Sequence, residues 1–169
     1  MPEEYVNYRD SYPNLQKALK NGAKLHASLS GGGLRIVSIE KKNEETKKVE
    51  SLSYGEHPYF SGALVHADED FGLSYEQQYT AENAKHRHYL TGAYSLPYDA
   101  LDAHIKAGRS IDVFYCKRWG QYICTTPVPY NLRRNNEILW GSSDNILGAI
   151  LSCLLLFQFE DKEEFEKRI

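Results

Sequence analysis

The sequence has no strong excess of either charge and no extended run of like charge. Its 20 Lys and Arg residues stand against 23 Asp and Glu residues, giving a net charge of -3. This balance predicts no broad attraction to anionic lipid, and it disfavours nucleic acid as a partner. The first thirteen residues contain neither a basic region nor an apolar run, so we expect no secretory signal.

Cysteine is scarce, and its spacing matches no metal or redox motif. The three cysteines are Cys116, Cys124 and Cys153, an odd number without a CxxC pair. Together with the lack of a signal, this favours free thiols in a cytoplasmic protein. The HExxH, GxGxxG and Walker patterns are also missing, and we therefore expect no cofactor.

Only one long apolar run is present, from Ile146 to Phe157. As a helix it would be about 18 Å long, whereas a membrane span takes roughly 20 residues, so we expect no membrane contact. A helix that is apolar on all sides must be hidden from water. It is predicted to lie at the centre of the core, with a homodimer interface as the alternative.

The remaining pattern predicts an α+β fold. Apolar residues alternate with polar ones around Gly31–Gly33, and residues 25–29 and 34–39 are predicted to form a hairpin. Residues 1–10 are expected to be a flexible N-terminus, and residues 11–169 a single domain without an internal repeat. We expect a mainly antiparallel sheet of about five or six strands with helices packed on one face. Further strands are predicted at 49–54, 63–66, 110–116 and 122–126, and helices at 13–21, 97–107 and 146–157.

A cluster of basic and aromatic residues is the main candidate for a binding surface. Arginine beside exposed aromatic side chains is typical of protein hot spots and of single-stranded nucleic acid sites. A hairpin tip at Trp119-Gly120 would expose the Trp119 ring as a contact residue. A loop of two residues would place Tyr115 opposite Cys124, and a loop of three residues would place Cys116 there. The predicted binding residues are Arg118, Trp119, Arg133, Arg134 and Tyr122.

The histidines offer an alternative. His86 and His88 would share a face if their segment is a strand, and His57 or His66 could then supply a further metal ligand. In a helix the two rings would point apart, and two exposed histidines on a polar strand are the simpler interpretation. A cysteine nucleophile beside His104 is a second catalytic arrangement, although strand cysteines more often belong to the core.

The sequence therefore predicts a small cytoplasmic binding or regulatory module without catalytic activity. Its expected partner is a protein that contacts the Arg/Tyr/Trp surface. The alternative function is a metal-dependent or thiol hydrolase that uses the histidine cluster.

Overall fold

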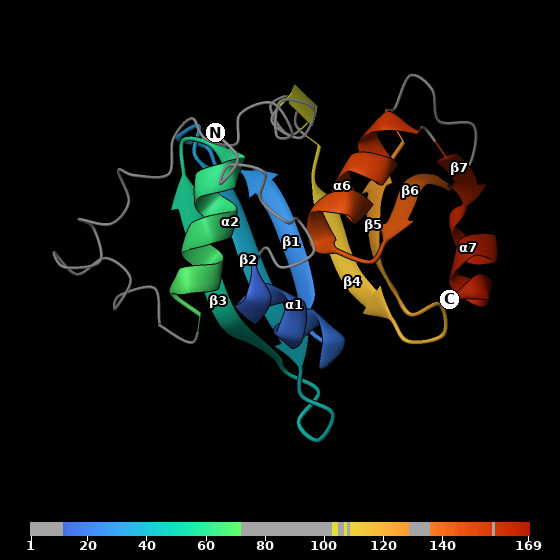
Figure 1. Ribbon diagram of the computed structural model, residues 1–169, viewed down its shortest axis with the longest axis horizontal. Coiled ribbons are helices and arrows are strands. Elements are labelled where there is room, and N and C mark those ends of the chain that lie inside the picture. Colours follow the sequence, from blue (N-terminus) through green and yellow to red (C-terminus); the bar gives the residue numbers. More distant parts are fainter. Residues whose placement is uncertain (1–11, 72–102, 105–106, 108, 129–135, 157) are drawn as a thin grey trace, which may run out of the picture.

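The strands form one antiparallel sheet with the order β3-β2-β1-β4-β5-β6-β7 (Figure 1). The computed structural model describes residues 12–71, 103–104, 107, 109–128, 136–156 and 158–169. The α+β prediction is confirmed, but the sheet has seven strands within these described ranges and not five or six. The strands are β1 (Lys24–Leu29), β2 (Arg35–Lys42), β3 (Val49–His57), β4 (Ile111–Cys116), β5 (Gln121–Pro127), β6 (Glu137–Ser143) and β7 (Gln158–Asp161).

Helices lie on both faces of this sheet, which corrects the expectation that they share one face. The main core lies under α1 (Pro13–Lys20), α2 (Phe60–Glu69) and α6 (Ile146–Leu155). The short helix α7 (Lys162–Arg168) instead buries Phe165 in a second cluster with Ile123. Ile123 alternates with the core residues Tyr122 and Cys124 of β5, so α7 packs on the opposite face. We call this opposite face the open face.

Helix α2 occupies a segment that was predicted to contain a strand at Ala63–His66. Phe60, Ala63, Leu64 and Ala67 are each at most 1 % exposed, and this spacing is that of one helix face. The N-cap residue Tyr59 makes no side-chain cap hydrogen bond. The usual start signal of a helix is therefore missing, which explains the error.

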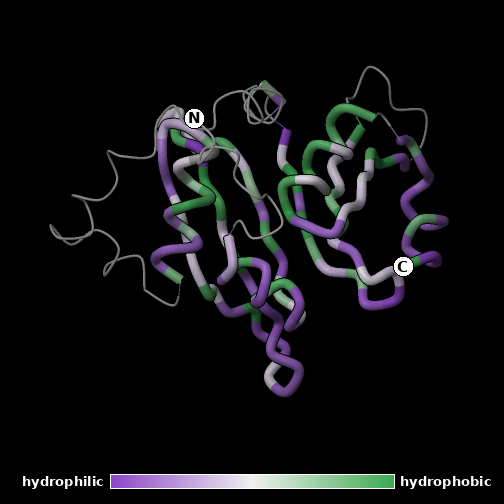
Figure 2. The backbone as a smooth tube through the Cα atoms, in the orientation of Figure 1, coloured by the Kyte–Doolittle hydropathy of each residue, from purple (hydrophilic) through white to green (hydrophobic). Residues whose placement is uncertain are grey.

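Helix α6 contains most of the long apolar run (Figure 2). The Asn145 side chain accepts a hydrogen bond from the Gly148 N–H at 2.7 Å and caps the helix. The helix packs on β5 and β6 and its buried side chains belong to the main core, whereas a central place in that core stays a prediction. It ends before Leu156, which is 62 % exposed. No helix among the described residues is long and apolar enough to cross a membrane.

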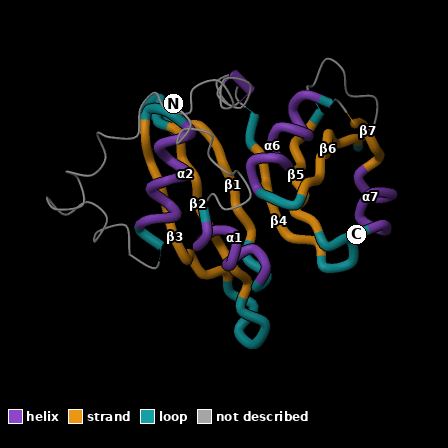
Figure 3. Tube along the Cα trace, in the orientation of Figure 1, coloured by secondary structure: helices purple, strands orange, loops and turns teal. Residues whose placement is uncertain are grey.

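Six of the seven described strands form two similar halves, a repeat that the sequence pattern does not indicate. Three antiparallel strands followed by a helix form β1-β2-β3-α2, and the same arrangement recurs in β4-β5-β6-α6 (Figure 3). Gly55 of β3 lies directly beneath α2, against the backbone at Ala63 and Ala67. Gly141 of β6 lies beneath α6 in the same way, against Cys153. Each half thus brings its helix onto its third strand through one glycine.

The two halves are related by an approximate twofold axis at the β1–β4 boundary. Leu25 pairs with Val113 and Ala27 pairs with Ile111, and His26 pairs with Asp112 between them. The same separation of 86 residues relates His26 to Asp112 and Gly55 to Gly141. The axis therefore passes through the His26–Asp112 pair.

The turn between β4 and β5 is longer than predicted. Cys116 pairs with Gln121, so residues 117–120 form the turn, with Gly120 at a φ of 65°. This register places Val113 opposite Cys124, and both predicted pairings of Cys124 are wrong. Tyr122 of β5 lies in the helix-covered core, where it is 1 % exposed.

Candidate functional site

A row of mainly polar side chains crosses the middle of the open face. Its members are direct cross-strand neighbours, so their side chains project from the same face of six adjacent strands. From β3 to β6 the row is Tyr54, Ser38, His26, Asp112, Thr125 and Trp140.

An ionisable pair lies at the centre of this row. His26 Nδ1 is 2.8 Å from Asp112 Oδ1, and the two side chains are 42 % and 33 % exposed. The hydrogen bond to Asp112 raises the pKa of His26 above its ordinary value against the opposing effect of burial, and the negative charge of Asp112 adds to the rise. The pair therefore places an imidazole whose protonated form is favoured by Asp112 at the twofold axis.

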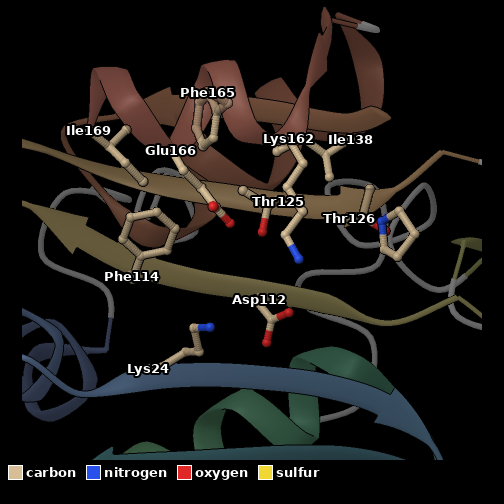
Figure 4. Close-up of a pocket in the computed structure, with 11 residues that line it drawn as sticks. Lys24, Asp112, Phe114, Thr125, Thr126, Ile138, Lys162, Phe165, Glu166 and Ile169 are labelled. Carbon is tan, nitrogen blue, oxygen red and sulfur yellow. The ribbon is translucent and has the colours of Figure 1, made fainter. Parts of the chain in front are cut away.

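A groove opens beside this pair, between the sheet and α7 (Figure 4). Its volume is about 390 Å³, which lies within the range of small-molecule sites. Its floor comes from β1, β4, β5 and β6, and its other wall from α7. The lining residues are Lys24, Asp112, Phe114, Thr125, Thr126, Pro127, Ile138, Lys162, Phe165, Glu166 and Ile169. We call this cavity the α7 groove.

The α7 groove combines apolar walls with a few ionic groups. Lys24 of β1 and Lys162 of α7 approach it from its two sides (Figure 4). Within the described part of the chain neither amine has a carboxylate within ion-pair distance. Asp112 is already bonded to His26. The groove therefore offers cations that can bind a negatively charged group next to apolar surface.

Helix α7 is fixed in place from several directions, so the groove is preformed. Asp161 caps the helix by accepting from the N–H groups of Glu163 and Glu164. The Phe165 ring, 1 % exposed, packs 5.2 Å from Trp140. At its end, the Arg168 guanidinium bonds Glu160 at 2.7 Å.

The predicted Arg/Tyr/Trp surface is only partly present. Arg118 is exposed at the β4–β5 turn. Trp119 contacts α7, because its Nε1 donates to the Arg168 carbonyl at 3.1 Å and its ring packs 5.6 Å from Trp140. Tyr122 lies in the core, which excludes it from an exposed surface. Arg133 and Arg134 lie outside the described residues.

Only two of the four histidines in the predicted cluster lie among the described residues. His57 and His66 are 5 % and 3 % exposed, and their rings meet edge to face at 5.1 Å between β3 and α2. His86 and His88 lie outside the described residues. Among the residues that the structure does describe, no three His, Cys, Asp or Glu side chains are grouped to hold a metal.

The arrangement needed for a thiol nucleophile does not occur either in the described part of the chain. Cys116, Cys124 and Cys153 are all buried, and burial raises the pKa of the Cys124 thiol, which disfavours the reactive thiolate. His104 is bound elsewhere: its Nε2 lies 2.9 Å from the Thr126 hydroxyl.

Ser38, His26 and Asp112 supply the residue types of a hydrolytic triad on three adjacent strands. Such a triad requires a hydrogen bond from the serine hydroxyl to the imidazole. No such bond joins Ser38 and His26 among the described contacts.

The residues at the centre of the groove were not singled out by the sequence analysis. The alternation in 24–29 does place Lys24 and His26 on one strand face, opposite Leu25 and Ala27. Nothing local, however, indicates that this strand pairs with the one that carries Asp112. Lys162 is one of several charged residues in its segment, and its place over the sheet follows from the contacts that hold α7, among them the packing of Phe165.

Comparison with protein-family models, with curated proteins and with solved structures finds no match to this chain.

Proposed function

We propose that this chain is a binding module that holds a small, partly apolar organic ligand in the α7 groove. The observation that carries the proposal is the groove itself, a preformed cavity of about 390 Å³ with aromatic and aliphatic walls and a few ionic groups. Such a combination is typical of ligand sites, because apolar contact supplies affinity and a few polar groups orient the ligand.

Binding without chemistry is the simplest use of these residues. The His26–Asp112 pair could polarise a proton, but its neighbour Ser38 is not bonded to it. In the described part of the chain the cysteines are buried and no metal-ligand group is assembled. A metal-dependent or thiol hydrolase therefore has less support than a binding protein.

The predicted protein partner also has less support than a small ligand. Of that surface, Arg118 is exposed, whereas Trp119 already packs on α7 and Tyr122 is buried. A cytoplasmic location remains a prediction from composition. Self-association through the end of α6 also remains a prediction, and exposed Leu155, Leu156 and Phe159 give it an apolar surface.

The experiment that tests the proposal is a fragment screen read by isoleucine methyl resonances. Ile138 and Ile169 line the groove, whereas Ile39 of β2 and Ile150 of α6 lie in the main core on the opposite face of the sheet. We expect some small amphipathic fragments to shift the first pair in a saturable manner and to leave the second pair unchanged.

A groove-filling variant provides the matched control. Thr125→Phe places a ring on the groove floor and should abolish these shifts, while Thr46→Phe in the exposed β2–β3 loop should retain them. If no fragment shifts Ile138 or Ile169, or if Thr125→Phe binds like the original protein, the proposed function is wrong.

A further inference from the structure

We propose that the ligand of the α7 groove is an organic monocarboxylate with an aliphatic or aromatic tail. This inference rests on the proposed function and adds to it the charge and the shape of the ligand. It follows from how the lysines, the carboxylates and the apolar residues are distributed around the cavity.

The charge of the ligand follows from two lysines on opposite sides of the groove. Lys24 begins β1, and Lys162 begins α7, so they approach the cavity from the sheet and from the helix (Figure 4). Neither amine forms an ion pair with a described carboxylate. A carboxylate placed between them would accept hydrogen bonds from both ammonium groups.

The number of negative charges follows from the acids around the same cavity. Asp112 Oδ1 is 2.8 Å from His26 Nδ1, so this oxygen already has a partner. Glu166 projects from α7 into the lining without a described partner, and it would repel a ligand with several negative charges. With Lys24 and Lys162 positive and Glu166 negative, a ligand with one negative charge matches the charge of the groove better than a phosphate or a dicarboxylate does.

The tail of the ligand follows from the apolar walls. Phe114 from β4, Ile138 from β6, and Phe165 with Ile169 from the C-terminal segment line the groove. Thr125 also lines the groove and lies beside Lys162 in the view of Figure 4. A ligand that places its carboxylate near the lysines can therefore lay its tail along the aromatic and aliphatic side chains.

The test is calorimetry with four probes of related shape. Octanoate carries both features, acetate carries only the charge, octanamide carries only the tail, and octylamine reverses the charge. We expect octanoate to bind most tightly, and its dissociation constant to fall about three- to fourfold for each methylene added from hexanoate to octanoate. Acetate should bind too weakly to measure.

Lysine variants identify the position of the carboxylate. Lys162→Met keeps the apolar stem and should weaken octanoate binding roughly tenfold or more, because a charge-assisted hydrogen bond is lost. Lys167→Met is the matched control, since Lys167 is on the same helix but bonds Glu164 at 3.4 Å outside the groove lining. Lys24→Met should behave like Lys162→Met, and Lys41→Met in β2 like the original protein.

The outcomes separate this inference from the proposed function. If octanamide or octylamine binds as tightly as octanoate and shifts the Ile138 and Ile169 methyl groups, the groove is a site but the carboxylate assignment is wrong. The assignment is also wrong if Lys24→Met and Lys162→Met both bind octanoate like the original protein. If none of the probes shifts either methyl group and the fragment screen also finds no binder, both proposals fail.

Discussion

His26 and Asp112 face each other across the boundary between β1 and β4, with Nδ1 and Oδ1 2.8 Å apart. This boundary is the only strand pairing that joins the two halves of the described sheet. The pair therefore lies on the approximate twofold axis, and Asp112 also lines the α7 groove. One side-chain contact thus connects the symmetry of the fold with the candidate site.

Replacing Asp112 should lower the pKa of His26. The Asp112 hydrogen bond is the largest contribution that raises this pKa, and Glu40 and Lys24 contribute less, in opposite directions. In Asp112→Asn we expect the pKa to fall toward 6.5, as followed by the pH dependence of the His26 ring resonances. Glu40→Gln should change it much less. Equal shifts in the two variants would contradict the pairing.

The same pair predicts a direction for stability against pH. Because the pKa of His26 is raised in the folded state, its contribution to the free energy of unfolding is fully present below pH 6.5. It is lost as the pH rises through the folded value. The free energy of unfolding of the original protein, measured with urea, should therefore decrease relative to that of Asp112→Asn as the pH rises across this interval.

His104 should change the stability with pH in the opposite direction to His26. Burial, reinforced by the positive charge of Arg109, lowers the pKa of His104 to about 4. As the pH falls, His104 takes up a proton near pH 6.5 in the unfolded chain, but only near pH 4 in the folded protein. Stability that is fully present above pH 6.5 is thus lost as the pH falls toward 4, by at most about 3 kcal/mol. Urea titrations from pH 4 to 7 should show this loss.

The matched variant for this prediction is His104→Gln. Its side chain can still donate to the Thr126 hydroxyl, which itself donates to the Ser110 carbonyl at 2.7 Å, but it does not titrate. The difference in unfolding free energy between the original protein and this variant should shrink below pH 6.5. A difference that is constant with pH would show that His104 is not the group responsible.

Asp68 of α2 caps α1 from a distant part of the chain. Its Oδ1 accepts from the N–H groups of Asn14 and Leu15 at 2.8 and 3.0 Å, while the N-cap residue Tyr12 supplies no side-chain bond. Asp68→Ala should destabilise the protein by about 1–2 kcal/mol, measured by urea unfolding at pH 7. Asp68→Asn keeps a side-chain oxygen that can accept these bonds, and it should be destabilised less than Asp68→Ala.

The carboxyl of Asp68 also predicts how stability depends on pH. Burial raises the pKa of this carboxyl although the two N–H groups oppose the rise. Its ionised form is therefore less favourable in the folded protein than in the unfolded chain, and stability should fall slightly as the pH rises from 3.8. If Asp68→Ala proves as stable as the original protein, the distant cap contributes nothing.

The two equivalent glycines should both be intolerant of alanine. A Cβ atom on Gly55 would overlap the Ala63 carbonyl oxygen, and one on Gly141 would overlap the Cys153 nitrogen. Each substitution must displace a helix and should cost about 1–3 kcal/mol, measured by thermal and urea unfolding. Gly31→Ala, in a turn with nothing within 4 Å, should cost far less. A mild effect at one of the two glycines alone would argue against their equivalence.

Local patterns predicted the elements better than their assembly. Pro13 and Gly22 bracket α1 as expected, and the alternation in 24–29 predicted β1. The repeat escaped detection because its two copies share little beyond a glycine under each helix and the Gly-Ala steps at Gly62 and Gly148. The role of these glycines becomes visible only in the folded structure, where they lie at the contact between a helix and a strand.

The candidate site depends on contacts between residues far apart in the sequence. His26 and Asp112 are separated by 86 residues, and antiparallel pairing of β1 with β4 leaves no local signal in either strand. The predicted exposure of Tyr122 failed for a related reason. Tyr122 alternates with Ile123 along β5 and faces the helices, and which face of the strand the helices cover depends on distant segments of the chain.

The most direct test of the central claim is an octanoate titration followed by tryptophan fluorescence. The chain has two tryptophans, Trp119 and Trp140, and both pack against Phe165 in the wall of the α7 groove. We predict a saturable change in emission, with the midpoint shifted roughly tenfold to higher concentration in Lys162→Met and unshifted in Lys167→Met. An emission that shows no saturable change, or that saturates identically in both variants, would contradict ligand binding at this groove.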